Sequence, residues 1–208
     1  NIAGGKNYVE GSMGTDDTYG HGTAVASIIL ENAPDTELVA LVSSVYEHGR
    51  LKQVDADTFA GIIIDAVDVY GCDVINISAG FAADVEAVRL AVEYAAHKGV
   101  VVVASAGNDY VENPDVKYYP AAYDDVIAVG SMNESRTAIS DFSQRGEWVD
   151  MYECGENITV RTLSGDSREV SGTSYAAAGV TSKVCRMLEE NSGLTVDKVL
   201  EIIDFKGN

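Results

Sequence analysis

The sequence predicts a single three-layer α/β domain, in which a mostly parallel sheet has helices on both faces. Short apolar runs, of the length of strands buried on both faces, alternate with longer segments of helical periodicity. The chain of 208 residues is long enough to bury the core that such a domain needs. Residues 1–208 contain no repeat, low-complexity tract or linker that would divide them into two domains.

The predicted strands and helices alternate along most of the chain. Strands are expected at 37–42, 73–78, 100–104 and 126–129, where the apolar runs occur. Helices are expected at 57–70 and 84–98, which end at Gly71 and Gly99, and again at 173–190 and 195–203. The segment 148–170 is more polar and rich in turn residues, so a hairpin region is expected there.

Charge and composition exclude several classes of function. The chain has 14 basic and 33 acidic residues and a net charge of −19, which disfavours binding to nucleic acid. No apolar run approaches the roughly 20 residues that a membrane-spanning helix needs. Three scattered cysteines, at positions 72, 154 and 185, form neither a zinc motif nor a disulfide framework, so they leave the compartment open.

A histidine between two glycines lies at the predicted start of a small-residue helix. His21 would feel the positive end of the helix dipole there, which favours the neutral imidazole that a general base needs. A histidine can also occupy a helix start without any catalytic role. The other two histidines, His48 and His97, lie in polar surroundings and are expected at the surface.

A serine lies at the predicted start of a second helix, shortly after a glycine. Ser174 follows Gly172 and precedes a run of alanines, so its helix has little side-chain bulk and can pass through the middle of a domain. Serine at a helix start is often only a cap, but Ser171 is the better-placed candidate for that role. Ser174 is therefore predicted to be a nucleophile at the beginning of a buried helix.

Polar residues follow two of the predicted strands, at the edge of the sheet where ligands bind in parallel α/β folds. Asn108 follows one strand, and it is either a turn residue or an amide donor to an oxyanion. Residues 78–80 follow another strand and offer backbone groups along which an extended peptide can pair.

Taken together and in this order, the motifs are similar to those of the subtilisin-like serine peptidases over nearly the whole chain. The matching segments are 21–23 (His-Gly-Thr), 76–80 (Asn-Ile-Ser-x-Gly), 106–108 (Ala-Gly-Asn), 119–123 with 126–130, 142–143, and 172–177 (Gly-Thr-Ser-Tyr-Ala-Ala). Three departures leave the catalytic groups in place: Ala24 after the histidine motif, Ala178 where the family has proline, and 153–155 (Glu-Cys-Gly) where it has Ala-Pro-Gly.

The resemblance implies roles for particular residues. It implies that His21 is the general base, Ser174 the nucleophile and Asn108 the side-chain donor to the oxyanion. The implied walls of the substrate channel are Ser78, Ala79 and Gly80 on one side, and Ala104, Ser105, Ala106 and Gly107 on the other. Asp109 would border the pocket for the residue before the cut and favour lysine or arginine there, while the small Ala79 would widen the adjacent pocket.

The resemblance fails before His21. In the family an aspartate precedes the histidine by about 30 residues, on a strand with a Val-x-Asp-x-Gly context. Only 20 residues precede His21, and Asp16 and Asp17 among them follow no apolar strand. We therefore expect residues 1–208 to be the later, larger part of a peptidase domain, with the aspartate on a separate or cleaved N-terminal segment. Without that strand, 37–42 and the valine run 100–103 are expected to lie uncovered.

The resulting functional hypothesis is hydrolysis of peptide bonds in peptide or protein substrates through an acyl-enzyme. The alternative is a pseudoprotease that binds peptides or other proteases without cutting them. No catalytic cofactor is expected, and the resemblance allows structural calcium, although no loop has a specific ligand pattern and no metal ligand is assigned. The resemblance favours a secreted or cell-surface location, while the free cysteines leave the cytoplasm open.

Overall fold

The computed structural model describes residues 2–191, 194, 198–199 and 201–202. Its helices are α1 (His21–Asn32), α2 (Ala56–Asp68), α3 (Glu86–His97) and α4 (Thr173–Glu190). Its strands are β1 (Ile2–Asn7), β2 (Leu38–Val42), β3 (Ser44–Glu47), β4 (Arg50–Gln53), β5 (Val74–Ile77), β6 (Val101–Ser105), β7 (Val126–Met132), β8 (Met151–Cys154), β9 (Ile158–Arg161) and β10 (Ser167–Val170).

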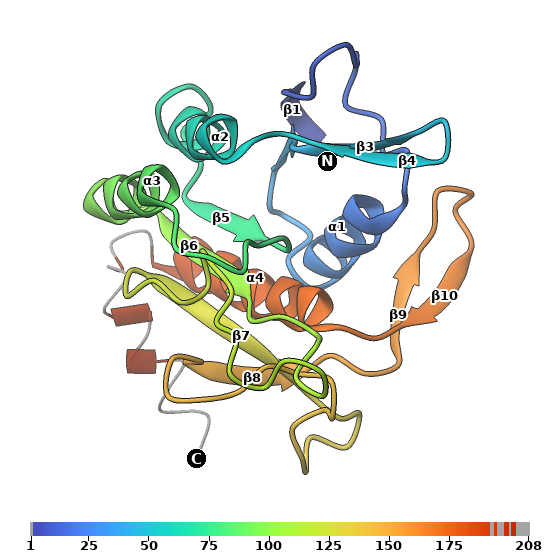
Figure 1. Cartoon of the computed structure of the whole chain (residues 1–208), viewed down its shortest axis with the longest axis vertical. Coiled ribbons are helices and arrows are strands. Elements are labelled where there is room, and N and C mark those ends of the chain that lie inside the picture. Colours follow the sequence, from blue (N-terminus) through green and yellow to red (C-terminus); the bar gives the residue numbers. More distant parts are fainter. Residues whose placement is uncertain (1, 192–193, 195–197, 200, 203–208) are drawn as a thin grey trace.

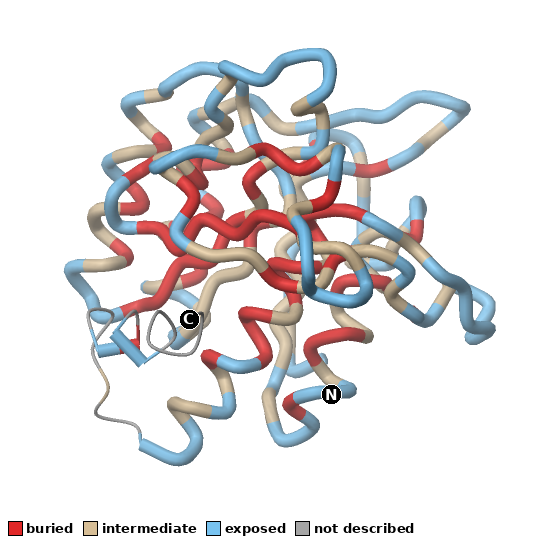
Figure 2. Tube along the Cα trace, turned by 90° about the horizontal axis from the view of Figure 1, so that it is seen from below, coloured by how far each residue is buried: buried red, intermediate tan, exposed pale blue. Residues whose placement is uncertain are grey.

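The predicted three-layer architecture is confirmed. Strands β5, β6, β7 and β8 form a parallel sheet in that order. Alternate residues of β6 face opposite layers: Val102 and Ala104 pack with α2 and α3, whereas Val101 and Val103 pack against α4. Figure 1 shows α2 and α3 on one side of these strands and α4 on the other. In Figure 2 the buried residues run along the central strands, and the loops around them are exposed.

Helix α4 passes through the domain, as its alanine run predicts. Ala176 and Ala177 are fully buried against the sheet, and Ala178 is fully buried against α1. Because none of these side chains extends beyond a methyl group, the helix can pack closely on both neighbours. The first turn of α4, which carries Ser174, is thereby fixed between the sheet and α1.

Apart from the helix expected at 195–203, the strands and helices that the sequence predicts are present, with ends that differ by at most three residues. Three features differ from the prediction. Strand β1 and the exposed hairpin β3–β4 were not expected, and β8 joins the parallel sheet although a hairpin was expected for 148–170. Strands β9 and β10 do form an antiparallel hairpin within that segment. The expected helix 195–203 lies mostly outside the described residues.

The sheet is divided between β2 and β5. Among the described residues, strand β1 pairs only with β2, in a separate two-stranded parallel sheet, and β5 pairs on one side only, with β6. A cavity of about 180 Å³ lies between the two parts, and residues of β2, α2 and β5 line it, among them Val39, Leu41 and Ile75. We call this space the strand gap.

The strand gap corrects one expectation. The valine run was expected to lie uncovered beside a missing strand, but β6 is paired on both edges and its valines are buried. The segments that border the gap are β2, every residue of which is only half-buried, and β5. Unpaired backbone edges of this kind can accept a further strand.

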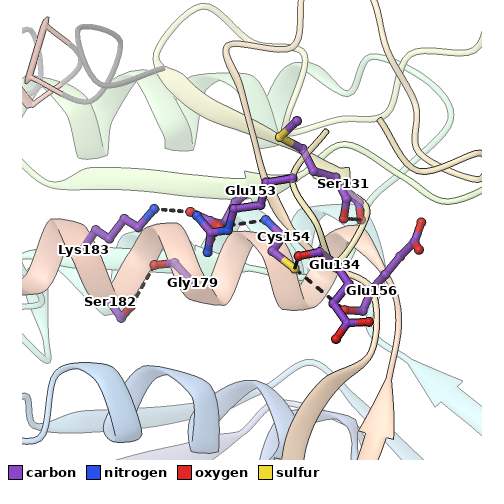
Figure 3. Close-up of polar contacts among 10 residues, drawn as sticks. Ser131, Glu134, Glu153, Cys154, Glu156, Gly179, Ser182 and Lys183 are labelled. Atoms are coloured by element: carbon purple, nitrogen blue, oxygen red, sulfur yellow. Dashed lines mark hydrogen bonds and ion pairs between the residues drawn. The ribbon is translucent and has the colours of Figure 1, made fainter. Parts of the chain in front are cut away.

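A buried carboxylate joins β8 to α4. Glu153 on β8 is only 5% exposed, and it pairs with Lys183 on α4 and with Arg136 at 2.7 Å (Figure 3). The Cys154 N–H also donates to its Oε1 at 2.8 Å. Directly beyond, the Gly172 N–H donates to the carbonyl of Gly155 at 2.8 Å. The glutamate that departs from the family's Ala-Pro-Gly turn therefore ties the second half of α4 to β8, while the hydrogen bond from Gly172 to Gly155 holds the start of the helix.

Candidate active site

Ser174 lies in the first turn of α4. The residue before the helix, Gly172, has φ +155° and makes no side-chain cap. Ser171 does not cap the helix as expected, because its Oγ accepts the N–H of Asn157 at 3.1 Å. Ser174 is 8% exposed, and its carbonyl accepts a hydrogen bond from Ser78 Oγ at 3.2 Å. The nucleophile predicted from the sequence is thus fixed at the carboxyl end of β5.

His21 is the first residue of α1, and its ring lies beside α4. The centroids of the His21 and Tyr175 rings are 5.8 Å apart, and Tyr175 directly follows Ser174. Burial lowers the pKa of His21 below its usual 6.5, and the positive charge of Arg168 lowers it further, while Asp17 opposes both. The neutral imidazole is therefore the favoured form, as a general base requires.

Asp17 holds the backbone that precedes His21. Its carboxylate accepts the N–H groups of Tyr19 at 2.8 Å, Gly20 at 2.7 Å and Thr23 at 2.7 Å. Burial raises the pKa of Asp17, but these backbone donors outweigh that effect and hold the pKa below its usual range. Both oxygens of Asp17 are thus bonded to the backbone at the start of α1, and Asp16 is exposed to solvent.

Asn108 is oriented by the residue that precedes the nucleophile. Its Oδ1 accepts both the Thr173 N–H at 2.8 Å and the Thr173 hydroxyl at 2.9 Å. Since two donors fix the amide oxygen, the Nδ2 group is the end that remains to donate elsewhere. Asn108 is exposed beside Ser174, where its amide can reach an oxygen that becomes negatively charged.

The two expected channel walls both contact the start of α4. Ser78 reaches the Ser174 carbonyl, and the Gly107 N–H donates to the Thr173 hydroxyl at 3.2 Å. The first wall continues into a pair of hydrogen bonds between Phe81 and Tyr119, at 2.7 and 2.9 Å. The structure therefore brings residues 78–80 and 104–107 together on either side of the serine.

The described part of the chain holds no cluster of three or more histidine, cysteine, aspartate or glutamate side chains that could bind a metal ion. Calcium stays an expectation from the resemblance, and no step of the chemistry proposed below uses it. Within the same residues, no helix has the length and apolarity needed to cross a membrane.

Protonation of His21 gives a first prediction. Because its pKa is lowered, the imidazole should stay neutral to a lower pH than free histidine, so its titration midpoint should fall below 6.5. Arg168→Ala removes a positive charge and should raise the midpoint. Proton NMR titration measures both, with the signals assigned through His48→Gln and His97→Gln. The matched control is Arg145→Ala, whose guanidinium lies over the Tyr110 ring; a His21 midpoint at or above 6.5 would contradict the prediction.

The fold and the arrangement of these side chains define an α/β protein of the subtilisin-like class. The chain belongs to the subtilase family, whose model matches residues 3–204. It is 33% identical over 210 residues to the "Major intracellular serine protease" of Bacillus subtilis (strain 168), an alignment that covers 92% of this chain and 64% of the relative. It is 32% identical over 203 residues to "Subtilisin DY" of Bacillus licheniformis, covering 95% of this chain and 74% of that protein.

A solved structure shows the same fold. The match with the crystal structure of a cold adapted subtilisin-like serine proteinase covers 97% of this chain and 74% of that one, with a TM-score of 0.81 and 24% identity. The predicted fold class and family are thus confirmed. The chain spans 64% of the length of the first of these relatives and 74% of the length of the second.

Proposed function

We propose that this chain is the larger part of a serine endopeptidase that cuts peptide bonds through an acyl-enzyme. Ser174 Oγ attacks the scissile carbonyl while His21 takes its proton, and His21 then returns the proton to the leaving amine. The tetrahedral oxyanion is stabilised by Asn108 Nδ2 and by the backbone N–H of Ser174. Water then releases the acyl group by the same steps, with His21 again as base.

The orientation of Asn108 is the observation that carries the proposal. A turn asparagine needs no fixed amide, but here Thr173 holds Oδ1 through two hydrogen bonds, at 2.8 and 2.9 Å. Thr173 directly precedes Ser174, so the amide donor and the nucleophile are linked through one residue. Such preorganised donors stabilise a transition state without reorganising during the reaction.

We further propose that the aspartate that orients His21 comes from a separate or preceding N-terminal segment. The strand gap supports this, because in the part of the chain that the structure describes β2 and β5 each present an unpaired edge to one cavity, which is lined mostly by apolar side chains. Helix α2 connects these two strands, as in a parallel crossover. A parallel strand in the gap would end beside Ser78, at the same edge of the sheet as Ser174.

A pseudoprotease is the second candidate. It is favoured by one observation: in the described residues, no carboxylate is hydrogen-bonded to His21, and Asp17 is bonded to the backbone instead. A protein of this kind would bind peptides along residues 78–80 without cutting them. The neutral His21 and the oriented Asn108 are features that simple peptide binding does not need.

Active-site labelling separates the two candidates. The protein is treated with a serine-directed phosphonate, and the labelled residue is identified by peptide mass spectrometry. An endopeptidase should be labelled at Ser174 alone, and Ser174→Ala should abolish the label. Peptide binding without any labelling would support the pseudoprotease instead.

Asn108→Ala gives a second prediction. It should lower turnover on the order of 10²–10³-fold with little change in apparent substrate affinity, because the lost donor acts on charge that develops in the transition state. Steady-state kinetics on a chromogenic peptide measures both quantities. Asn113→Ala is the matched control, since that side chain donates to Asp109 at 2.9 Å. An effect of Asn108→Ala on affinity alone would identify an ordinary binding residue.

The natural substrate is proposed to be a peptide or protein, in line with the family. The name of one relative includes "intracellular", and the name of the other gives no compartment. The location outside the cell that the resemblance favours therefore stays a prediction.

A further inference from the structure

The space beside Ser174 between the two channel walls has a definite role in the proposed reaction. When Ser174 attacks and Asn108 holds the oxyanion, the acyl carbon is fixed at the start of α4. The side chain of the residue before the cut must then lie beside Ser174, between residues 78–80 and 104–107. Both walls are fixed there, through Ser78 and Gly107.

One side chain from outside both walls lies against a residue of each wall. A Cβ atom built on Gly107, which has φ +113°, would lie 2.6 Å from Tyr118 Cδ2 and 3.1 Å from Tyr118 Cε2. A Cβ atom built on Gly80 would lie 3.7 Å from Tyr118 Cβ. Tyr118 therefore contacts both walls, and its ring lies directly against Gly107, as only a glycine permits.

The ring of Tyr118 is held at its far end. Its hydroxyl donates to Asp109 Oδ2 at 2.5 Å, and this hydrogen bond, together with burial, raises the pKa of Tyr118 to about 12. The same carboxylate accepts Asn113 Nδ2 at 2.9 Å, and Gln144 Nε2 lies 3.5 Å from its other oxygen. Asp109 was expected to attract a basic side chain, but the structure gives it these partners instead.

We propose that Tyr118 determines specificity by filling the pocket for the residue before the cut, so that only small side chains such as glycine, alanine or serine fit. The inference rests on the proposed function, and it replaces the expected preference for lysine or arginine. The contacts of Tyr118 are with the channel walls and with Asp109, and not with Ser174 or His21, so its proposed role is in specificity and not in catalysis.

Two variants test the role of the ring. Tyr118→Ala removes it, and Tyr118→Phe keeps it while releasing Asp109. The specificity constant is measured for peptides that differ only in the residue before the cut: alanine, phenylalanine or lysine. The wild type should prefer alanine. Tyr118→Ala should raise the phenylalanine-to-alanine ratio about 10- to 100-fold, the range that changes of pocket volume produce. Tyr118→Phe should keep the preference for alanine.

The control is Tyr94→Ala on α3, which also removes a tyrosine that is hydrogen-bonded to an aspartate, Asp68 at 2.8 Å. It should leave the ratio unchanged. Binding of the matching peptide boronic acids to the wild type gives a second readout, independent of turnover and of whether a variant folds. A wild type that binds or cuts after phenylalanine as well as after alanine overturns the inference. Failure to label or cut with any peptide, when the N-terminal aspartate segment is also supplied, would instead overturn the proposed function.

Discussion

With the N-terminal aspartate segment supplied, Ser174→Ala and His21→Ala should each lower turnover by about 10⁴–10⁶-fold, and the double variant should be little worse than either single one. The reason is that Ser174 and His21 act as one unit. A serine hydroxyl without a base is a poor nucleophile, and a base without the serine has no hydroxyl nucleophile to activate. Initial rates on a chromogenic peptide, measured for the wild type, both single variants and the double variant, give the comparison.

Two matched variants control for the substitutions themselves. Ser171→Ala removes an exposed serine close to Ser174, and His97→Ala removes a histidine at the end of α3. Both should retain most activity, and circular dichroism should show the wild-type fold in all variants. Losses from Ser174→Ala and His21→Ala that multiply in the double variant would show that the two residues act independently. Full activity in Ser174→Ala would exclude the acyl-enzyme altogether.

The central part of the fold could be predicted because its strands are strongly apolar, and two of them, β6 and β7, are buried on both faces. The runs that became β5, β6 and β7 are apolar at nearly every position, which is the pattern expected of strands in a parallel sheet covered on both faces. Strand β1 has the sequence Ile-Ala-Gly-Gly-Lys-Asn and exists through its pairing with β2, a long-range contact that no local pattern shows. The hairpin β3–β4 is largely exposed, so it has no buried face from which alternation could be read.

The positions of the candidate catalytic residues could be predicted from short motifs, whereas their supporting contacts could not. His21 and Asn108 each stand next to a glycine that marks a turn or helix start, and Ser174 lies two residues after such a glycine, Gly172. The contacts of Glu153 with Lys183, and of Tyr118 with Gly107, join residues that are distant in the sequence. An acidic residue at 153 and a tyrosine at 118 have no local signal, and only the packing of α4 and the channel walls reveals what they do.

A peptide that carries a Val-x-Asp-x-Gly strand should bind in the strand gap and raise turnover about 10⁴-fold over the same peptide with asparagine in place of aspartate. The aspartate would accept a hydrogen bond from His21 and hold the tautomer whose other nitrogen faces Ser174. It would also raise the pKa of His21, because a nearby negative charge favours the imidazolium that forms during catalysis. The asparagine peptide supplies the strand without the charge.

Cys72 allows binding to be measured separately from activity, because it lines the strand gap. Burial raises the pKa of its thiol, so labelling is followed at alkaline pH in a background of Cys154→Ser and Cys185→Ser. Both peptides should protect Cys72 equally, while only the aspartate peptide should restore turnover and raise the His21 midpoint. Protection without any gain in turnover would mean that a strand completes the sheet but does not orient His21. Equal turnover with no peptide and with either peptide would mean that the group that orients His21 is already in the chain. Asp17→Asn would then test Asp17, a partly buried carboxylate four residues before His21.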